Sequence, residues 1–188
     1  MIFVTVGTQL PFDRMISTID TWAAESGRAD VFAQIGPSHY KPRAIQCAPF
    51  LPADECRQKI EQAELIIAHA GMGSIITALE LGKPILVMPR RSNLNEHRNN
   101  HQVSTAQKFL EQGRIHVAMD EKELAARLVD IKGITCRDKA DGHASPQLLQ
   151  ALSDFFRRGK VPGRVVISSH DELPPPNADL RPAGQTYR

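Results

Sequence analysis

The sequence predicts an α/β fold in which a doubly wound, mostly parallel, Rossmann-like sheet is covered by helices on both faces. Short apolar runs alternate with longer segments of helical periodicity over roughly the first 130 residues. The apolar runs are continuous, which suits strands buried in a parallel sheet. Glycines separate several of these runs from the segments that follow them. This alternation favours a parallel sheet with crossover helices.

The first half of the chain predicts three strands and two helices. Residues 2–6 and 31–35 are apolar runs of strand length, and residues 12–26 between them carry apolar side chains at helical spacing. Residues 45–51 look extended, and the proline among them indicates an edge strand or a bend. Residues 52–63 follow as a helix with acidic residues near its start.

The second half begins with the most informative unit of the chain. Residues 65–68 are an apolar strand, and Gly71 and Gly73 form the turn that follows it. Ser74 is expected to cap a short helix, and Gly82 is expected to close it. The remaining elements are expected at residues 85–88 (strand), 90–100 (polar loop), 101–111 (helix), 115–118 (strand) and 121–129 (helix).

Three segments of different character divide the chain. Residues 1–131 form the predicted domain, and residues 132–160 hold a polar link and an amphipathic helix that starts near Ser145. Residues 161–188 are rich in proline and polar residues and are expected to be disordered. The basic cluster at residues 157–160 is better explained as a solvated helix end than as a docking site for anionic lipid or a partner.

Composition excludes several classes of function. The 23 Lys and Arg residues nearly balance the 21 Asp and Glu residues, which argues against a nucleic-acid-binding protein. The three cysteines fit neither a zinc site nor a redox pair and indicate a reducing compartment. No apolar run approaches the roughly 20 residues of a membrane span, and no leader precedes the first strand. We therefore expect a cytoplasmic protein that only a partner would hold at a membrane.

A ligand site is predicted at one edge of the sheet. Ligands of such sheets bind outside the carboxyl ends of the strands, where Gly7 and Thr8, Phe50 and Leu51, His69, and the loop from Arg90 onward are expected.

The glycine turn is the strongest candidate within that edge. The turn reads Gly71-Met72-Gly73-Ser74, and it would place backbone N–H groups beside the positive end of a helix dipole, which suits a phosphate. It is neither a P-loop nor a full dinucleotide fingerprint, because Ile76 stands where a third glycine belongs. A tight turn without any ligand is the alternative.

Histidines supply the other candidates. His69 ends an apolar strand, where a buried structural histidine is the usual finding, but its place at the ligand edge makes it a candidate catalytic residue. His97 and His101 are four residues apart, as in a metal-binding helix. No third ligand of suitable spacing accompanies them, so we expect contact with a sugar hydroxyl or a phosphate and no metal site. A solvated loop without any ligand is the alternative.

These residues resemble a known family. The run from His69 through Ser74 to Gly82-Lys83-Pro84, followed by His101-Gln102, is similar to the C-terminal domain of family 28 glycosyltransferases. The likeness covers roughly residues 1–130 and is strongest to small single-domain members. These are the soluble subunit of the dolichol-pathway N-acetylglucosaminyltransferase and the E-type subunit of bacterial exopolysaccharide glycosyltransferases. Residues 96–102 favour the bacterial group.

The resemblance implies that this chain is half of an enzyme. Such enzymes have a GT-B architecture, with two doubly wound domains facing across a cleft. The chain would be the half that binds the UDP-sugar donor, and a membrane-anchored subunit would bind a lipid-linked saccharide acceptor. The likeness implies no cofactor and no obligatory metal.

Individual residues take their expected roles from the same likeness. Phe50 and Leu51 match positions that frame the uracil ring, and His101 and Gln102 match a pair that contacts the transferred sugar. The turn that would face the diphosphate consists of Gly71, Met72, Gly73 and Ser74.

The ribose position departs from the pattern. Thr77 stands where one branch of the family has a glutamate that grips the ribose, so Glu96 is a candidate to replace it.

The predicted function is therefore transfer of a hexose from a UDP-sugar to a polyprenyl-diphosphate-linked acceptor in exopolysaccharide or capsule synthesis. A hexosyltransferase of this kind would be active only with its partner. The alternative is a protein of the same fold that binds a nucleotide sugar, or stabilises a partner, without turnover.

Overall fold

The computed structural model describes residues 1–136 of the 188-residue chain. Within them, all pairs of neighbouring strands are parallel, and the sheet order is β3-β2-β1-β4-β5-β6. The strands are β1 (Ile2–Thr5), β2 (Val31–Gln34), β3 (Gln46–Ala48), β4 (Leu65–His69), β5 (Ile85–Met88) and β6 (His116–Val117). This order confirms the predicted doubly wound α/β fold, with the direction of winding reversing between β1 and β4.

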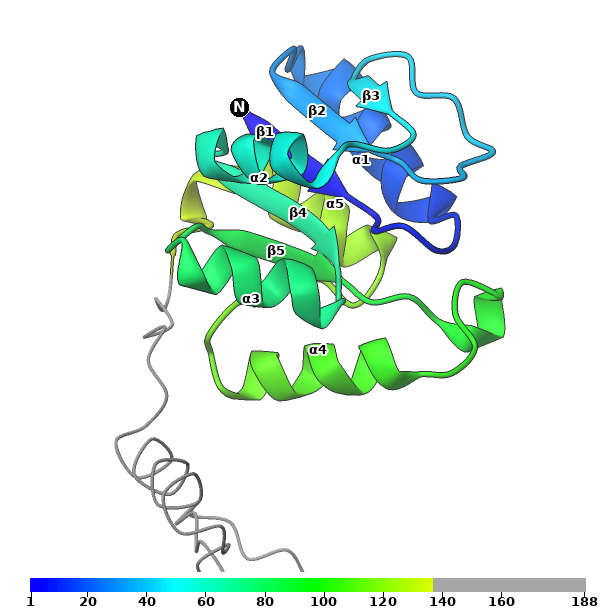
Figure 1. Ribbon diagram of the computed structural model, residues 1–188, viewed down its shortest axis with the longest axis vertical. Helices are drawn as coiled ribbons and strands as arrows, with labels where there is room; N and C mark the ends of the chain where they lie inside the picture. Colours follow the sequence, from blue (N-terminus) through cyan, green and yellow to red (C-terminus); the bar gives the residue numbers. More distant parts are fainter. Residues whose placement is uncertain (137–188) are drawn as a thin grey trace, which may run out of the picture. The chain divides into compact units, whose positions relative to one another are not determined.

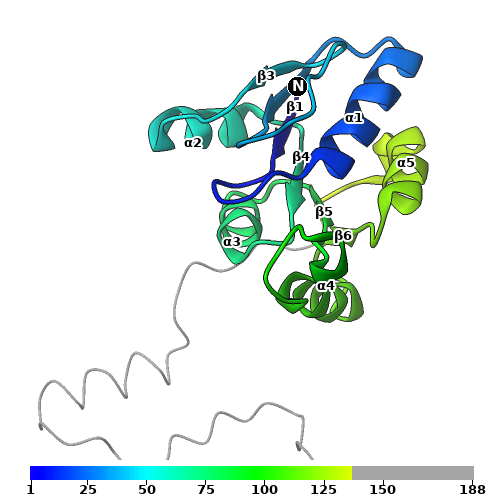
Figure 2. The same ribbon diagram turned by 90° about the vertical axis from the view of Figure 1, so that its right-hand side faces the viewer.

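Helices cover both faces of the sheet (Figures 1 and 2). The α-helices are α1 (Asp13–Ser26), α2 (Ala53–Gln62), α3 (Met72–Glu80), α4 (His101–Glu111) and α5 (Glu121–Val129), and short 3₁₀ turns are η1 (Ser92–Leu94) and η2 (Ile131–Gly133). The edge-on view separates α1 and α5 from α2 and α3 (Figure 2). Two apolar clusters fill the interior, one under α1 and α5 and the other under α2, α3 and α4.

Periodicity explains the helices that the sequence predicted well. In α1, Met15, Ile16 and Ile19 are fully buried against the sheet, and the helix ends at Gly27 in the left-handed conformation (φ 67°). Pro49 predicts an edge strand or a bend, and β3, which it follows, lies at the edge of the sheet.

The start of α3 differs from the prediction. The helix begins at Met72, so Gly71 is its N-cap and Ser74 lies inside the first turn. Gly71 is extended (φ −88°, ψ 134°) and donates its N–H to the His69 carbonyl at 2.8 Å, which turns the chain into the helix earlier than a Ser74 cap would. Because the N-cap is a glycine, α3 has no side-chain cap, and no side chain among residues 1–136 accepts a hydrogen bond from the N–H groups of its first turn.

Some expectations fall beyond the described residues. They are the helix starting near Ser145, the basic cluster at residues 157–160 and the tail at residues 161–188. Among residues 1–136, no helix is both long enough and apolar enough to cross a bilayer.

Candidate functional site

A pocket of about 290 Å³ lies at the carboxyl ends of β1, β4 and β5. Its position includes the switch point between β1 and β4, which is where open α/β sheets bind ligands. The candidate residues from the sequence that line it are Gly7, Thr8, His69, Gly73, Ser74, His97 and Gln102. The structure therefore brings together residues that are up to 95 positions apart in the sequence, since 102 − 7 = 95.

The N-terminal turn of α3 forms one wall of the pocket. Gly73 and Ser74 both line it. A Cβ atom placed on Gly73 would meet no atom within 4 Å, so the backbone at this position is open to a ligand. Uncapped N–H groups and the helix dipole together make this wall attractive to an anion.

The β1–α1 loop forms the opposite wall and is held firmly at Gly7. The residue has a positive φ of 76°. Its N–H donates to Thr5 Oγ1 at 3.2 Å, and its carbonyl accepts from Gln34 Nε2 at 3.3 Å. A side chain would be strained here, and it would also press on the imidazole of His69.

His69 is packed between two glycine backbones. A Cβ on Gly7 would lie 2.8 Å from the His69 Cε1 atom, and one on Gly71 would lie 2.2 Å from Nε2. Burial, followed by the charge of Arg90, lowers the pKa of His69 to about 4. The imidazole is therefore neutral near physiological pH.

Arg90 is a pocket residue that the sequence placed at this edge of the sheet but to which it gave no role. It follows β5 and is only 3% exposed. Its guanidinium donates to the carbonyls of Val6 (2.7 Å), Leu10 (2.6 Å), Pro11 (2.6 Å) and Glu96 (3.3 Å). Burial lowers the pKa of Arg90 to about 10, so the side chain still carries its charge at neutral pH. The available signal was a charged residue placed directly after a buried strand.

The backbone of Arg90 fixes the orientation of Gln102. The Arg90 N–H donates to Gln102 Oε1 at 3.1 Å. Because this partner must be an acceptor, the Gln102 carbonyl oxygen faces Arg90 and its NH₂ group is left for the pocket.

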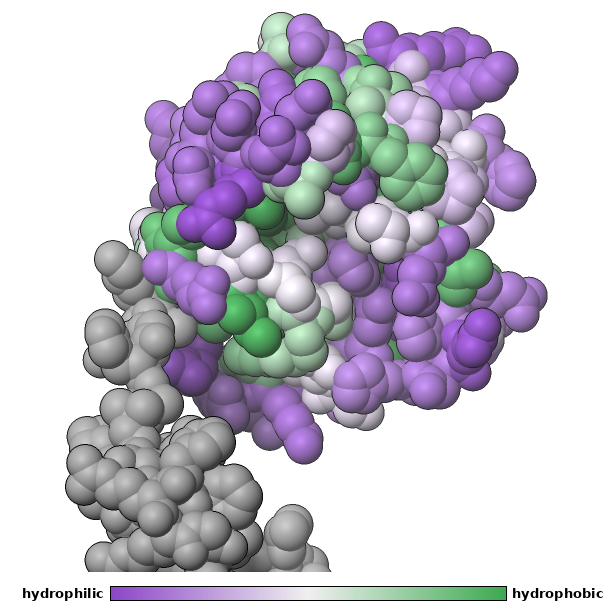
Figure 3. All heavy atoms as spheres, viewed as in Figure 1, coloured by the Kyte–Doolittle hydropathy of each residue, from purple (hydrophilic) through white to green (hydrophobic). Residues whose placement is uncertain are grey.

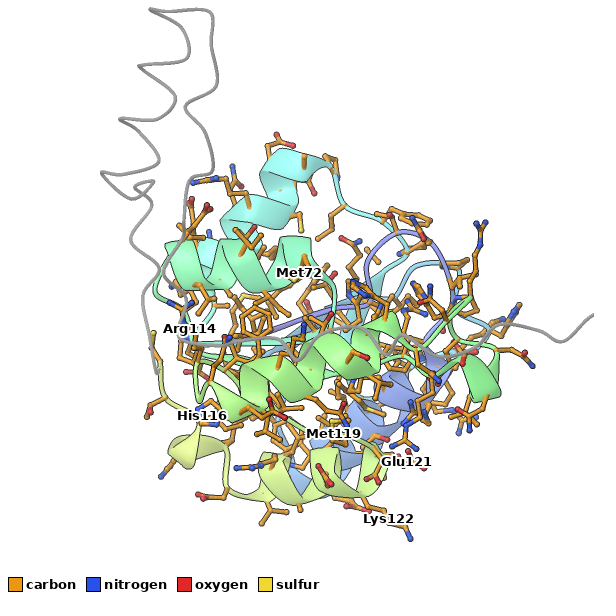
Figure 4. All side chains as sticks on the ribbon, turned by 90° about the horizontal axis from the view of Figure 1, so that it is seen from below. Met72, Arg114, His116, Met119, Glu121 and Lys122 are labelled. Carbon is orange, nitrogen blue, oxygen red and sulfur yellow. The ribbon has the colours of Figure 1, made fainter. Side chains whose placement is uncertain are left out.

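Other predicted site residues do not line this pocket. Phe50 is 52% exposed, Leu51 packs against the core cluster under α2, α3 and α4, and His101 is an exposed residue at the start of α4. Gly71 is the α3 cap, Thr77 lies further along that helix, and Met72 marks the helix start in Figure 4.

Glu96 is engaged in an ion pair instead. Both of its carboxylate oxygens accept hydrogen bonds from Arg14, each at 2.9 Å, and Oε2 also accepts from the Arg91 N–H at 2.9 Å. Contact between Glu96 and a ribose would require this pair to rearrange. His97 does line the pocket, but in the described part of the chain no group of three or more His, Cys, Asp or Glu residues is arranged to hold a metal ion.

Comparison with known proteins gives a family. The family model described as "Glycosyltransferase family 28 C-terminal domain" matches residues 1–152. The human protein named UDP-N-acetylglucosamine transferase subunit ALG13 is 32% identical over 125 residues, which cover 61% of this chain and 10% of that protein. The Yarrowia lipolytica protein of the same name is 27% identical over 64% of this chain and 65% of its own length. This chain thus spans about a tenth of the length of the human relative.

Solved structures agree on the fold. The solution structure of ALG13 has a TM-score of 0.53 and 21% identity, over 76% of this chain and 90% of that one. The crystal structure of Acinetobacter baumannii MurG has a TM-score of 0.57 and 19% identity, over 82% of this chain and 49% of that one. The family expected from the motifs is confirmed.

Proposed function

The chain belongs to the family of glycosyltransferase family 28 C-terminal domains, and we propose that it is the donor-binding subunit of a two-part glycosyltransferase. The observation that carries this proposal is the open N-terminal turn of α3, with Gly73 and Ser74 lining a pocket at the switch point of the sheet. This wall would hold the diphosphate of a UDP-sugar.

The same wall would stabilise the leaving group. Negative charge grows on the β-phosphate of UDP as the glycosidic bond breaks. Backbone N–H groups and a helix dipole already aimed at that charge lower the barrier without needing to reorganise. We therefore propose transfer that needs no divalent metal, and added EDTA should leave the rate unchanged.

The donor and acceptor follow from the relatives and the family likeness. Relatives named as UDP-N-acetylglucosamine transferase subunits make UDP-N-acetylglucosamine the first hexose donor to test. The acceptor proposed is a hydroxyl of a polyprenyl-diphosphate-linked saccharide, in exopolysaccharide or capsule synthesis.

A membrane-anchored partner completes the proposed enzyme and keeps this cytoplasmic chain at the inner face of the membrane. Met72 and Ile76, on the outer side of α3, are 42% and 45% exposed, and Met72 directly precedes the pocket residue Gly73. Figure 3 shows apolar side chains at the surface over α3. A subunit that closes the pocket would cover these side chains.

His69 is better suited to line the pocket as an uncharged ring than to act as a general base. A pKa of about 4 leaves the imidazole unprotonated but weakly basic, whereas an efficient base has a pKa near the working pH. We propose that the base which takes the acceptor proton lies on the partner.

The test is transfer by the complex of this chain with a membrane subunit that co-purifies with it. Radiolabelled UDP-N-acetylglucosamine and a polyprenyl-diphosphate saccharide are the substrates. Gly73→Asp places a carboxylate against the diphosphate and should lower transfer by roughly a hundredfold or more. Gln58→Asp adds the same charge on the exposed side of α2 and is the matched control.

Two outcomes would contradict the proposal. Transfer by the purified chain alone would rule out the two-part enzyme. Full activity of the complex carrying Gly73→Asp would favour the alternative role, in which the chain stabilises a catalytic partner.

A further inference from the structure

Arg90 carries a buried positive charge that forms no ion pair with a carboxylate among residues 1–136. In the part of the chain that the structure describes, no carboxylate lies within ion-pair distance of its guanidinium, although the residue is only 3% exposed. The four hydrogen bonds of the guanidinium all go to backbone carbonyls. Carbonyl dipoles satisfy the N–H groups but do not neutralise the charge.

The neighbouring Arg14 shows the contrast. Arg14 donates to both oxygens of Glu96 and to Glu121 at 2.7 Å, so two carboxylates balance its charge. Glu121 stands at the start of α5, as Figure 4 shows. Glu96 is the carboxylate whose charge acts on Arg90, but it already forms an ion pair with Arg14.

The hydrogen bonds of Arg90 also set the shape of the pocket. The acceptors Val6, Leu10 and Pro11 span the β1–α1 loop, whose Gly7 and Thr8 line the pocket. The guanidinium lies 4.8 Å from the centre of the buried Phe12 ring, at the end of the same loop. Arg90 therefore fastens this loop to the end of β5.

We propose that Arg90 is the positioning residue of the donor site, holding the β1–α1 loop in place while its unpaired charge attracts the diphosphate of the ligand. This inference rests on the proposed function. Because the N–H groups that bond the loop carbonyls are occupied, Arg90 acts on the diphosphate through its charge, and the direct hydrogen bonds come from the α3 turn.

Comparison of UDP with uridine tests the role of the charge. Affinities are measured by NMR titration of the full chain at low and high salt. Arg90→Gln should lower the affinity for UDP by about tenfold or more, as expected for loss of one nearby charge in a partly buried site. The affinity of the Arg90→Gln variant for uridine, which lacks phosphate, should stay within about twofold of the wild-type value. The salt dependence of UDP binding should be weaker in this variant than in the wild type.

Two further variants separate charge from folding. Arg90→Lys keeps the charge and loses the forked hydrogen bonds, so it should retain most of the preference for UDP over uridine even if the affinity for both falls. Arg14→Gln removes an arginine that also links α1 to the loop after β5, but whose charge is already paired. It should lower the unfolding temperature and leave the ratio of UDP to uridine affinity unchanged.

The outcomes distinguish this inference from the proposed function. If the wild-type chain binds neither UDP nor uridine, the proposed function fails. If the wild type prefers UDP and Arg90→Gln lowers both affinities in parallel, or neither, the inference about Arg90 is wrong and the proposed function stands. Should Arg90→Gln fail to fold, loss of the UDP preference in Arg90→Lys would overturn the inference equally.

Discussion

Close packing around one imidazole explains two of the glycines that the sequence places near the site. His69 leaves no room for a side chain on Gly7 or on Gly71. Only Gly7 has a positive φ, so Gly71 is required by space and not by backbone conformation. The uncharged His69 ring is therefore tightly packed against the backbones of Gly7 and Gly71, and it gives the pocket a rigid surface for a ligand to contact.

Burial of His69 predicts a pH dependence of stability. The folded pKa of about 4 lies below the ordinary 6.5, so the unfolded chain takes up the proton first. The contribution of neutral His69 to the free energy of unfolding is complete above about pH 6.5. As the pH falls from there towards 4, the free energy of unfolding decreases by up to about 1.4 kcal/mol per pH unit.

Denaturant unfolding between pH 7 and pH 5 measures this effect. Wild-type stability should fall more steeply with decreasing pH than that of His69→Asn. The same substitution at the exposed His39 is the matched control. Parallel slopes for wild type and His69→Asn would show that His69 is not held neutral by the fold.

Fixed orientation of Gln102 predicts a selective effect on the sugar. Gln102→Glu keeps an oxygen for the Arg90 N–H but replaces the pocket-facing NH₂ donor with an acceptor. Its added negative charge repels UDP and a UDP-sugar alike, so the ratio of the two affinities reports the sugar contact. That ratio should fall by about tenfold, roughly the value of one hydrogen bond.

Gln107→Glu, on an exposed position of α4, is the control for the added charge. An unchanged ratio of UDP-sugar to UDP affinity in Gln102→Glu would remove Gln102 from the sugar site.

Among the secondary-structure elements, α3 has an N-terminus that lowers the stability of the helix but leaves backbone N–H groups free to bind an anion. A glycine in its first turn lowers helix stability, and no side chain caps its N-terminus. Both features leave backbone N–H groups open to the pocket. An ordinary, well-capped helix would be more stable and would bind an anion less well.

Gly73→Ala should therefore separate stability from binding. The new Cβ meets no protein atom within 4 Å, so the helix should gain about 0.5–1 kcal/mol, while the methyl group obstructs the ligand. UDP affinity should fall by roughly tenfold or more, equivalent to about 1.4 kcal/mol.

Thermal unfolding and calorimetric titration of the same samples provide both readouts for Gly73→Ala. Gly113→Ala is the contrasting control, since Gly113 has open space but a φ of 65° and should be destabilised on substitution. Tighter UDP binding by Gly73→Ala would contradict the role given to α3.

Elements with a strong local signal were predictable from sequence, and the long-range contacts were not. The spans of α4 and α5 and the edge position of β3 follow from periodicity, glycines and one proline. The predicted Ser74 cap was wrong because the glycine turn enters the helix before that residue. The place of Arg90 at the ligand edge was predictable, but its role was missed because three of its carbonyl acceptors lie 79 to 84 residues away in the sequence, which no local pattern encodes.

For the whole molecule, the sheet order determines what the chain can do alone. With β1 and β4 adjacent at the switch point, the loops after β1 and β5 and the start of α3 meet in one pocket. Under the proposed function, one doubly wound domain supplies one wall of a GT-B cleft, so we expect the chain to bind the donor alone but not to catalyse the transfer alone. Binding and turnover are therefore expected to separate experimentally.

Titration of the isotope-labelled full chain with UDP, followed by the backbone amide signals, tests this account most directly. We expect saturable shifts at Gly7, Gly73, Ser74 and Arg90 without any partner subunit or metal. The absence of shifts at saturating UDP, or shifts confined to the opposite face between α1 and α5, would contradict it.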